Sequence, residues 1–330
     1  MCLISPLRLA ALAALLLPLP IAGHANDAVA GLDAGELVMR NSDAVEMAEE
    51  DLFLSLDQVR VRYLFRNRSK QPVTTLVAFP LPPIHMEMDH EYGFTARHRD
   101  PADSVDFRLW IDGRPVPVNS RARAETPEGR EVTALLQKWQ IPLIFLTPDA
   151  ASYDRLMARL EALPPEAMAE LRAAGAILQE PDMGFQPNWI THFSYYWQMT
   201  FPAGAAVEVR HAYVPVPEAF IFGRYDLEEG ALAQEVCMDN AFRAGARRLL
   251  GPDEYAATTG RLLRYVLTTA NSWRGPIGRF HLTIDKGRPD ALVSLCRDGI
   301  RKTGATRFEW QAQNWQPRRN LSVLFLAPPG

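Results

Sequence analysis

Large apolar side chains alternate with polar ones between Trp189 and Val214, and this pattern constrains the fold more than any other stretch. Alternate residues of a β-strand share one face. The first run therefore places a row of bulky side chains together: Trp189, Phe193, Tyr195, Trp197, Met199 and Phe201. Turn residues at 202–205 lead into a second alternating run, which predicts a β-hairpin. An aromatic face of this size predicts a core between two packed sheets.

Other alternating runs extend this prediction to a mainly β protein. Residues 59–66 predict an amphipathic strand, in which Val59, Val61, Tyr63 and Phe65 share one face and Arg60, Arg62 and Arg66 share the other. A polar turn then leads to the nearly all-apolar run 73–79, which predicts a second hairpin. Asp112-Gly113 has the composition of a two-residue hairpin turn. Before these, residues 32–56 predict short strands joined by the acidic link Glu49-Glu50-Asp51.

Between residues 130 and 175 the apolar spacing changes to that of helices. Ser152 is the expected N-cap of one helix, Pro165 is expected to open the next, and Gly175 to end it. Residues 217–260 show no clear period and are expected to be irregular, with strands following to the C-terminus.

The predicted fold class is one or two antiparallel β-sandwich units with a helical insert. The expected organisation follows the chain: a signal peptide (1–25), N-terminal sandwich strands (26–125), the helical insert (126–182), the aromatic hairpin completing the first sandwich (183–216) and a C-terminal β-rich domain (217–330).

The first residues have the pattern of an export signal. Arg8 precedes a short apolar run, and small residues up to Ala25 suit cleavage by a signal peptidase. A membrane anchor is the alternative, but the run is shorter than the roughly 20 residues that span a bilayer. We therefore expect a periplasmic or secreted protein with no membrane span after signal cleavage.

Cys237 and Cys296 remain once the leader is removed. An even pair in an oxidising compartment predicts a disulfide. A redox or metal pair is the alternative, but the sequence has no Cys-x-x-Cys.

Composition and motifs exclude several functions. The net charge of -4 and the pI of about 6.0 argue against a nucleic-acid partner. The sequence has no Gly-x-Ser-x-Gly, no His-Glu-x-x-His and no phosphate-binding glycine motif. No cofactor is predicted.

The candidate metal ligands are His85, Met86, Met88 and His90. Thioethers and imidazoles together suit copper in an exported protein. The alternative is a solvated loop whose methionines pack on the sheet.

The candidate binding residues are aromatic or cationic. Trp273 and Arg274 lie in a compact turn, and these types are common at recognition sites. The alternative is a turn whose tryptophan caps the core. Tyr196 and Trp197 of the aromatic run are further candidates. His192 and His211 could bind a metal or act as a base, or could serve as structural hydrogen-bonding groups.

Several blocks taken together resemble an exported bacterial family known only as domain of unknown function 4424. The resemblance covers nearly the whole mature chain and implies an exported, mainly β protein with no assigned activity. The blocks that carry it are Glu50-Asp51-Leu52 with Val59 to Tyr63, Val73 to Pro82, Tyr196 to Gln198 with Phe201 to Gly204, His211 to Pro215, and Tyr265 to Thr269 with Trp273 to Gly278.

These observations favour a non-enzymatic binding or interaction module of the bacterial envelope, with a protein or small-molecule ligand. One alternative is an envelope hydrolase that uses scattered His and carboxylate residues. Another is a periplasmic copper binder.

Overall fold

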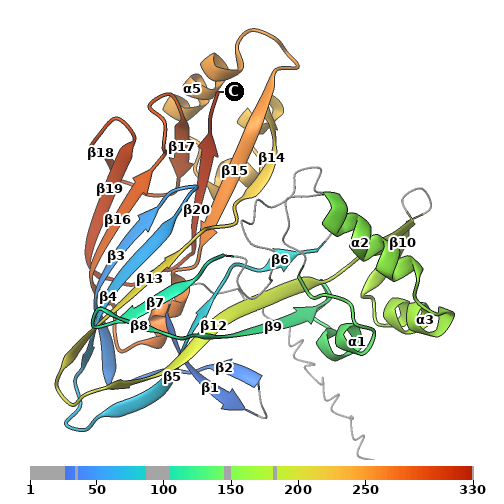
Figure 1. Ribbon diagram of the computed structural model, residues 1–330. Coiled ribbons are helices and arrows are strands. Elements are labelled where there is room, and N and C mark those ends of the chain that lie inside the picture. Colours follow the sequence, from blue (N-terminus) through green and yellow to red (C-terminus); the bar gives the residue numbers. More distant parts are fainter. Residues whose placement is uncertain (1–26, 34–35, 87–104, 145–149, 181–183, 329–330) are drawn as a thin grey trace, which may run out of the picture.

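A computed structural model describes residues 27–33, 36–86, 105–144, 150–180 and 184–328. In these ranges the protein is mainly β, with four sheets and five short helices (Figure 1). The predicted fold class is therefore confirmed. The predicted signal peptide lies outside the described residues, and no described helix is long and apolar enough to cross a membrane.

The largest sheet has eight strands. Its pairing is antiparallel except between β16 and β3, which come from opposite ends of the chain and run parallel. In spatial order the strands are β18 (Arg301–Lys302), β19 (Arg307–Trp315), β16 (Ile277–Asp285), β3 (Val45–Leu54), β4 (Val59–Asn67), β13 (Ala206–Tyr213), β7 (Arg108–Ile111) and β8 (Arg114–Val116).

Two further sheets pack against the inner face of the eight-stranded sheet, and one hydrophobic core joins all three. The six-stranded sheet contains β2 (Glu36–Met39), β1 (Ala28–Asp33), β5 (Val73–Pro80), β12 (Ile190–Phe201), β6 (Ile84–His85) and β9 (Asn119–Glu125). The four-stranded sheet contains β14 (Glu218–Gly223), β15 (Ala257–Tyr265), β20 (Leu321–Leu326) and β17 (Leu292–Leu295).

The four-stranded sheet is covered on both faces, which explains the nearly continuous apolar sequence of its strand β20. In β20, Val323 and Phe325 belong to the main core, while Leu324 and Leu326 belong to a second core. This second core lies under the helices α4 (Ala231–Glu235) and α5 (Asn240–Leu250). A strand buried on both faces loses the apolar and polar alternation that marks a half-exposed strand.

The two long predicted hairpins are wrong. Strand β12 pairs with β5, β6 and β9, whereas the next strand, β13, pairs with β4 and β7. The chain thus leaves one sheet at Phe201 and enters the other at Ala206. Strands β4 and β5 are separated in the same way, one in each sheet. Alternation predicted each strand and its buried face, but both sides of an arch between sheets show the same alternation as both sides of a hairpin.

The two arches lie side by side and are joined through Asn67, whose side chain is fully buried. Its Nδ2 donates to the carbonyl oxygens of Phe201 (2.9 Å) and Gln71 (2.8 Å), and its Oδ1 accepts from the backbone N–H of Ser69 (2.8 Å). Its backbone N–H donates to the carbonyl oxygen of Ala205 (3.0 Å). One amide therefore fixes the corner where both crossovers leave their sheets.

The predicted acidic link at residues 49–51 is part of the continuous strand β3. A bulge between Met47 and Glu49 lengthens this strand locally. The bulged residue Ala48 directs its carbonyl at Gly278 of β16, where a Cβ would lie 2.5 Å from that oxygen. Only glycine fits this contact, so the parallel pairing of β16 with β3 depends on it.

The helical insert contains α1 (Thr133–Lys138), α2 (Ala150–Glu161) and α3 (Pro165–Ala173), followed by a two-stranded sheet of β10 (Ile177–Glu180) and β11 (Gly184–Pro187). Pro165 opens α3 and Gly175, at φ +76°, follows its end, as predicted. Helix α2 begins two residues before Ser152, so the predicted N-cap is wrong.

The expectation of an irregular segment at residues 217–260 is also wrong. Its helix α5 has an N-cap, since Asp239 Oδ1 accepts from the N–H of Phe242 at 2.7 Å. Phe242, Ala246 and Leu250 recur every four residues and are buried. The helix was predictable from these signals. The predicted disulfide is present and joins Cys237, just after α4, to Cys296, just after β17.

Candidate binding groove on the eight-stranded sheet

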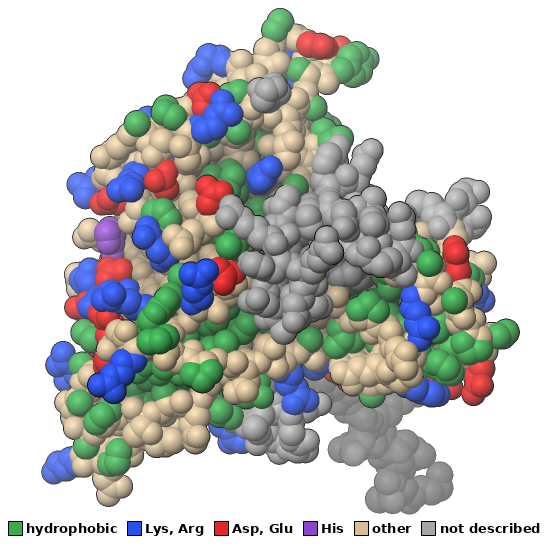
Figure 2. Space-filling model, viewed as in Figure 1, with side chains coloured by type: hydrophobic (Ala, Val, Ile, Leu, Met, Phe, Trp, Pro, Cys, Tyr) green, Lys and Arg blue, Asp and Glu red, His purple; other side chains and the backbone are tan. Residues whose placement is uncertain are grey.

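Charged side chains cover the outer face of the eight-stranded sheet. Figure 2 shows Lys and Arg interleaved with Asp and Glu on this flank, with a histidine among them. The pairing register arranges the outward side chains in two rows across five strands. The first row is His281, Asp51, Arg62, Arg210 and Trp110, and the second is Thr283, Phe53, Arg60, Ala212 and Arg108.

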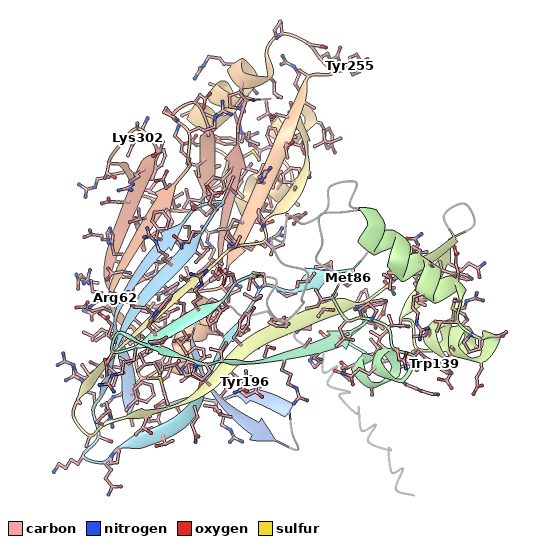
Figure 3. All side chains as sticks on the ribbon, viewed as in Figure 1. Arg62, Met86, Trp139, Tyr196, Tyr255 and Lys302 are labelled. Carbon is pink, nitrogen blue, oxygen red and sulfur yellow. A yellow bond between two sulfur atoms is a disulfide. The ribbon has the colours of Figure 1, made fainter. Side chains whose placement is uncertain are left out.

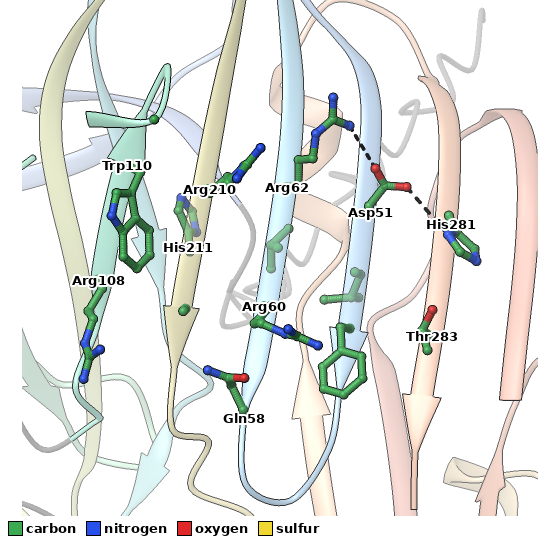
Figure 4. A pocket seen from close by; sticks show the side chains of 15 residues that line it. Asp51, Gln58, Arg60, Arg62, Arg108, Trp110, Arg210, His211, His281 and Thr283 are labelled. Carbon is green, nitrogen blue, oxygen red and sulfur yellow. Dashed lines mark hydrogen bonds and ion pairs between the residues drawn. The ribbon is translucent and has the colours of Figure 1, made fainter. Parts of the chain in front are cut away.

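A groove of about 650 Å³ follows these rows. Ala212 lies between Arg60 and Arg108 in the second row, and its single methyl group leaves the space that a longer side chain would fill. Figure 4 shows Trp110 and Arg108 on one side of the groove and Arg60 on the other. The lining residues are Asp51, Leu52, Phe53, Gln58, Arg60, Val61, Arg62, Arg108, Trp110, Gly113, Arg210, His211, Ala212, His281 and Thr283.

Carboxylates hold Arg62 of the first row in place. Its Nε lies 2.7 Å from Glu208 Oε2, and its Nη1 lies 2.9 Å from Asp51 and 3.1 Å from Glu49. Glu208 also pairs with Arg210 at 2.7 Å. The hydrogen bond that Arg62 donates to Glu208, followed by the one it donates to Glu49, raises the pKa of Arg62. This guanidinium is a fixed, charge-balanced part of the wall.

Asp51 is shared between two arginines. Its Oδ2 accepts from Arg62, and its Oδ1 accepts from Arg279 Nη1 at 3.1 Å. His281 Nδ1 lies 3.7 Å from the same carboxylate (Figure 4). Both oxygens of the acid are therefore engaged by cations that the sheet holds in register.

Arg60 differs from the other groove arginines. Its guanidinium lies over the ring of Phe53, 4.2 Å from the centroid. Among the described residues, no carboxylate lies within ion-pair distance of it. Arg108, in contrast, forms a salt bridge with Asp106, with Nε 3.0 Å from Oδ1. The groove thus carries one positive charge, on Arg60, that no described carboxylate balances.

His211 lines the groove through its strand, but its side chain points into the core and is fully buried. Its Nε2 lies 3.2 Å from Oδ1 of the equally buried Asp27. Burial raises the pKa of Asp27, and His211 opposes that shift. Beside this pair, the hydroxyls of Tyr63 and Tyr265 share a hydrogen bond of 3.1 Å. These groups form a buried polar cluster behind the groove.

The two candidate histidines of the aromatic run do not lie together. His192, in the six-stranded sheet, contacts Glu125 with Nε2 2.9 Å from Oε1. His211 lies in the other sheet and contacts Asp27. Each has its own local carboxylate, as the structural alternative expects.

The four predicted binding residues are not brought together. Trp273 and Trp197 are buried in the core at 3% and 2% exposure. Trp273 donates from Nε1 to the carbonyl oxygen of Asp27 at 2.7 Å. Arg274 is exposed beside the start of β3, where its backbone N–H donates to the carbonyl oxygen of Val45, and Tyr196 lies on the outer face of the six-stranded sheet (Figure 3). Neither tryptophan ring is accessible to a ligand from the surface.

Two of the four predicted copper ligands lie outside the described residues. Met88 and His90 belong to the undescribed range 87–104. His85 is exposed, whereas Met86 is buried at 5% exposure, so these neighbours face different environments. Within the described part of the chain, no group of three or more His, Cys, Asp or Glu residues could hold a metal.

The groove residues were missed because they come from five separate strands. The sequence did indicate that Arg60 and Arg62 share the outer face of one strand. It gave no signal that residues 108–110 and 210–212 would lie beside them, because strand order is set by the two arches.

One protein family matches nearly the whole length of the chain. A family model described as "Domain of unknown function (DUF4424)" matches residues 25–324. A crystal structure from Legionella pneumophila, described as "a putative nutrient binding protein", is 15% identical, covering 92% of this chain and 71% of its own, with a TM-score of 0.43. No curated protein matches the sequence.

Proposed function

The chain belongs to the DUF4424 family, and on that premise we propose that it is a non-enzymatic module that binds a small ligand outside the cytoplasm. The ligand would lie in the groove on the outer face of the eight-stranded sheet. The family description assigns no activity, so the proposal depends on this chain's own geometry.

The observation that carries the proposal is a preorganised polar groove of about 650 Å³. Sites for small molecules commonly enclose about 300–1,000 Å³. The walls stand on paired strands, and ion pairs fix Arg62 and Arg210 before any ligand arrives. Side chains already held in position lose little entropy on binding, which favours affinity.

The same groove is poorly suited to acid–base catalysis. Of the described residues that line it, Asp51 is the single acid, and both of its oxygens accept hydrogen bonds from arginines. A general base needs a free lone pair within reach of the substrate proton. Two histidines belong to the lining. The side chain of His211 points away into the core, and the ring of His281 lies between two carboxylates, with Nδ1 3.7 Å from Asp51 and Nε2 3.7 Å from Glu309. These features support binding over hydrolysis.

The disulfide supports a location outside the cytoplasm, because such bonds persist in oxidising compartments. Together with the predicted signal peptide, it favours the periplasm or the exterior. The negative net charge of -4 favours a small-molecule ligand or a protein over a nucleic acid.

The test compares two substitutions on the same face of β13. Ala212→Phe fills the floor of the groove, whereas Ala206→Phe adds the same ring at an exposed position outside it. Thermal unfolding is measured with sugars, organic acids, amino acids and phosphate. A ligand at about 100 times its Kd stabilises the folded state by about 2.7 kcal/mol. We expect one class to stabilise the native protein and the Ala206→Phe variant but not Ala212→Phe.

Two results would contradict the proposal. One is a ligand that stabilises all three proteins equally, because it would bind elsewhere. The other is chemical conversion of the ligand into a product during incubation with the protein, as monitored by NMR, because the protein would then be an enzyme.

A further inference from the structure

We infer that the groove selects a carboxylate attached to a hydroxylated ring, as in a uronic acid, with Arg60 binding the carboxylate and Trp110 contacting the ring. This inference rests on the proposed function and names the ligand class of the same groove.

The charge balance indicates an anion with a single negative charge. Arg62, Arg108 and Arg210 each have a carboxylate partner, at Glu208, Asp106 and Glu208 respectively. Arg60 has none among the described residues, so one positive charge is available to a ligand. A planar guanidinium matches a carboxylate with two parallel hydrogen bonds.

Phe53 prepares Arg60 for this contact. The guanidinium lies 4.2 Å from the ring centroid of Phe53, so one of its faces is covered. The N–H groups of a guanidinium lie in its plane and point away from such a stacked ring. A cation held by an aromatic ring is partly immobilised and loses less freedom when a ligand binds.

The spacing of the strands suits one ring beside that carboxylate. Arg60 and Arg108 occupy the same row on β4 and β7, with Ala212 of β13 between them. Adjacent strands lie about 4.8 Å apart, so the two outer strands are separated by about 10 Å. Trp110 flanks this gap on the β7 side (Figure 4). Its half-buried indole can pack on the apolar face of a ring.

One neutral polar side chain lines the same gap. Gln58 offers an amide that both donates and accepts hydrogen bonds. It carries no charge, so it can bond to a ring hydroxyl without favouring a second anionic group. Thr283 lines the groove beyond Phe53, on the side of Arg60 away from Trp110, so its hydroxyl does not face this gap.

The neighbouring carboxylates disfavour a phosphate dianion. Asp51 lines the groove directly, and Glu49 and Glu208 lie next to it through their ion pairs with Arg62. A second negative charge on the ligand would meet these carboxylates without an unbalanced arginine to offset them. A neutral sugar would cover Arg60 without supplying an acceptor of matching charge.

The test is isothermal titration calorimetry at millimolar concentrations of ligand. The probes are glucuronate and galacturonate, the neutral sugars glucose and galactose, and their 6-phosphates. The variants are Arg60→Gln, Arg60→Lys and Trp110→Leu. Arg301→Gln is the matched control, because Arg301 is an exposed arginine of the same sheet on β18, outside the groove.

We expect a uronate to bind more tightly than its neutral sugar and its phosphate. Arg60→Gln should weaken uronate binding about 10- to 100-fold, the effect of one charge-assisted contact. Arg60→Lys should restore part of that loss, since it keeps the charge but not the planar pair of donors. Trp110→Leu should weaken uronate and neutral sugar by similar factors, and Arg301→Gln should change neither.

Failure of the inference can be separated from failure of the proposed function. If neutral sugars or phosphates bind as tightly as uronates, and Trp110→Leu weakens them, the groove binds ligands but not through a carboxylate. If Arg60→Gln leaves uronate binding unchanged, the assigned role of Arg60 is wrong. If no probe binds, the uronic-acid class is wrong, while the Ala212→Phe comparison still tests the groove with other ligands.

Discussion

Replacing Asn67 by alanine should destabilise the protein far more than the loss of one small polar side chain suggests. Asn67 is fully buried where the two arches meet and makes three side-chain hydrogen bonds. The bond to the carbonyl oxygen of Phe201 is buried, so its loss leaves that oxygen with neither a protein donor nor water. An unsatisfied buried acceptor lowers the free energy of unfolding by about 1–3 kcal/mol. The bonds to Gln71 and Ser69 are partly buried, and water can replace them at about 0.5 kcal/mol each.

The free energy of unfolding of Asn67→Ala should therefore fall by about 2–4 kcal/mol. Urea unfolding at 25 °C, followed by tryptophan fluorescence, measures this change. Asn119→Ala is the matched control, because Asn119 is an exposed asparagine on β9. The free energy of unfolding of Asn67→Asp should fall by at least as much at neutral pH, because the carboxylate would face two carbonyl oxygens. A loss below about 1 kcal/mol for Asn67→Ala would refute the idea that this amide joins the arches.

Two further predictions concern the cysteines and the buried acid. Replacing Cys237 and Cys296 by serine should lower the free energy of unfolding by about 4 kcal/mol, from the chain-entropy relation for a loop closed over 59 residues. Urea unfolding of the oxidised protein and the double variant measures this loss, and equal stabilities would contradict it. Because burial raises the pKa of Asp27, the folded state binds a proton more tightly than the unfolded chain. The stability from Asp27 is then greatest below its unfolded pKa of about 3.9 and is lost as the pH rises through the folded pKa. In Asp27→Asn the free energy of unfolding should decline less steeply between about pH 4 and pH 7 than in the native protein. The same pH dependence in both proteins would contradict the raised pKa of Asp27.

Elements whose signal is local were predictable. The turn at Asp112-Gly113 joins β7 to β8 with both residues at positive φ, as the sequence predicted. Strand β20 lies in the C-terminal stretch where the sequence predicted strands. Helix α5 was missed although its N-cap and apolar spacing were present, so that error was one of interpretation. The division of the chain into domains stays a prediction.

The local sequence around Trp273 does not predict whether its side chain packs in the core or contacts a ligand. Its compact turn suited both a recognition loop and a core cap, because the same composition serves either purpose. The structure packs its ring 4.5 Å from that of Phe65 and gives its N–H a buried carbonyl oxygen. Only the arrangement of distant strands around residue 273 decides between the two interpretations.

The sequence by itself determined the β-rich class, the inward faces of the alternating strands β4, β12 and β13, the helical insert and the disulfide, because each depends on spacing along the chain or on residue type. The tertiary structure decided which strands became neighbours. The two arches send β4 and β13 into one sheet and β5 and β12 into the other, so Arg60, Arg108 and Ala212 meet across three strands. Alternation repeats every two residues whichever strand lies alongside, so it does not specify which strands pair. A groove lined by several strands therefore cannot be predicted until the strand order is known.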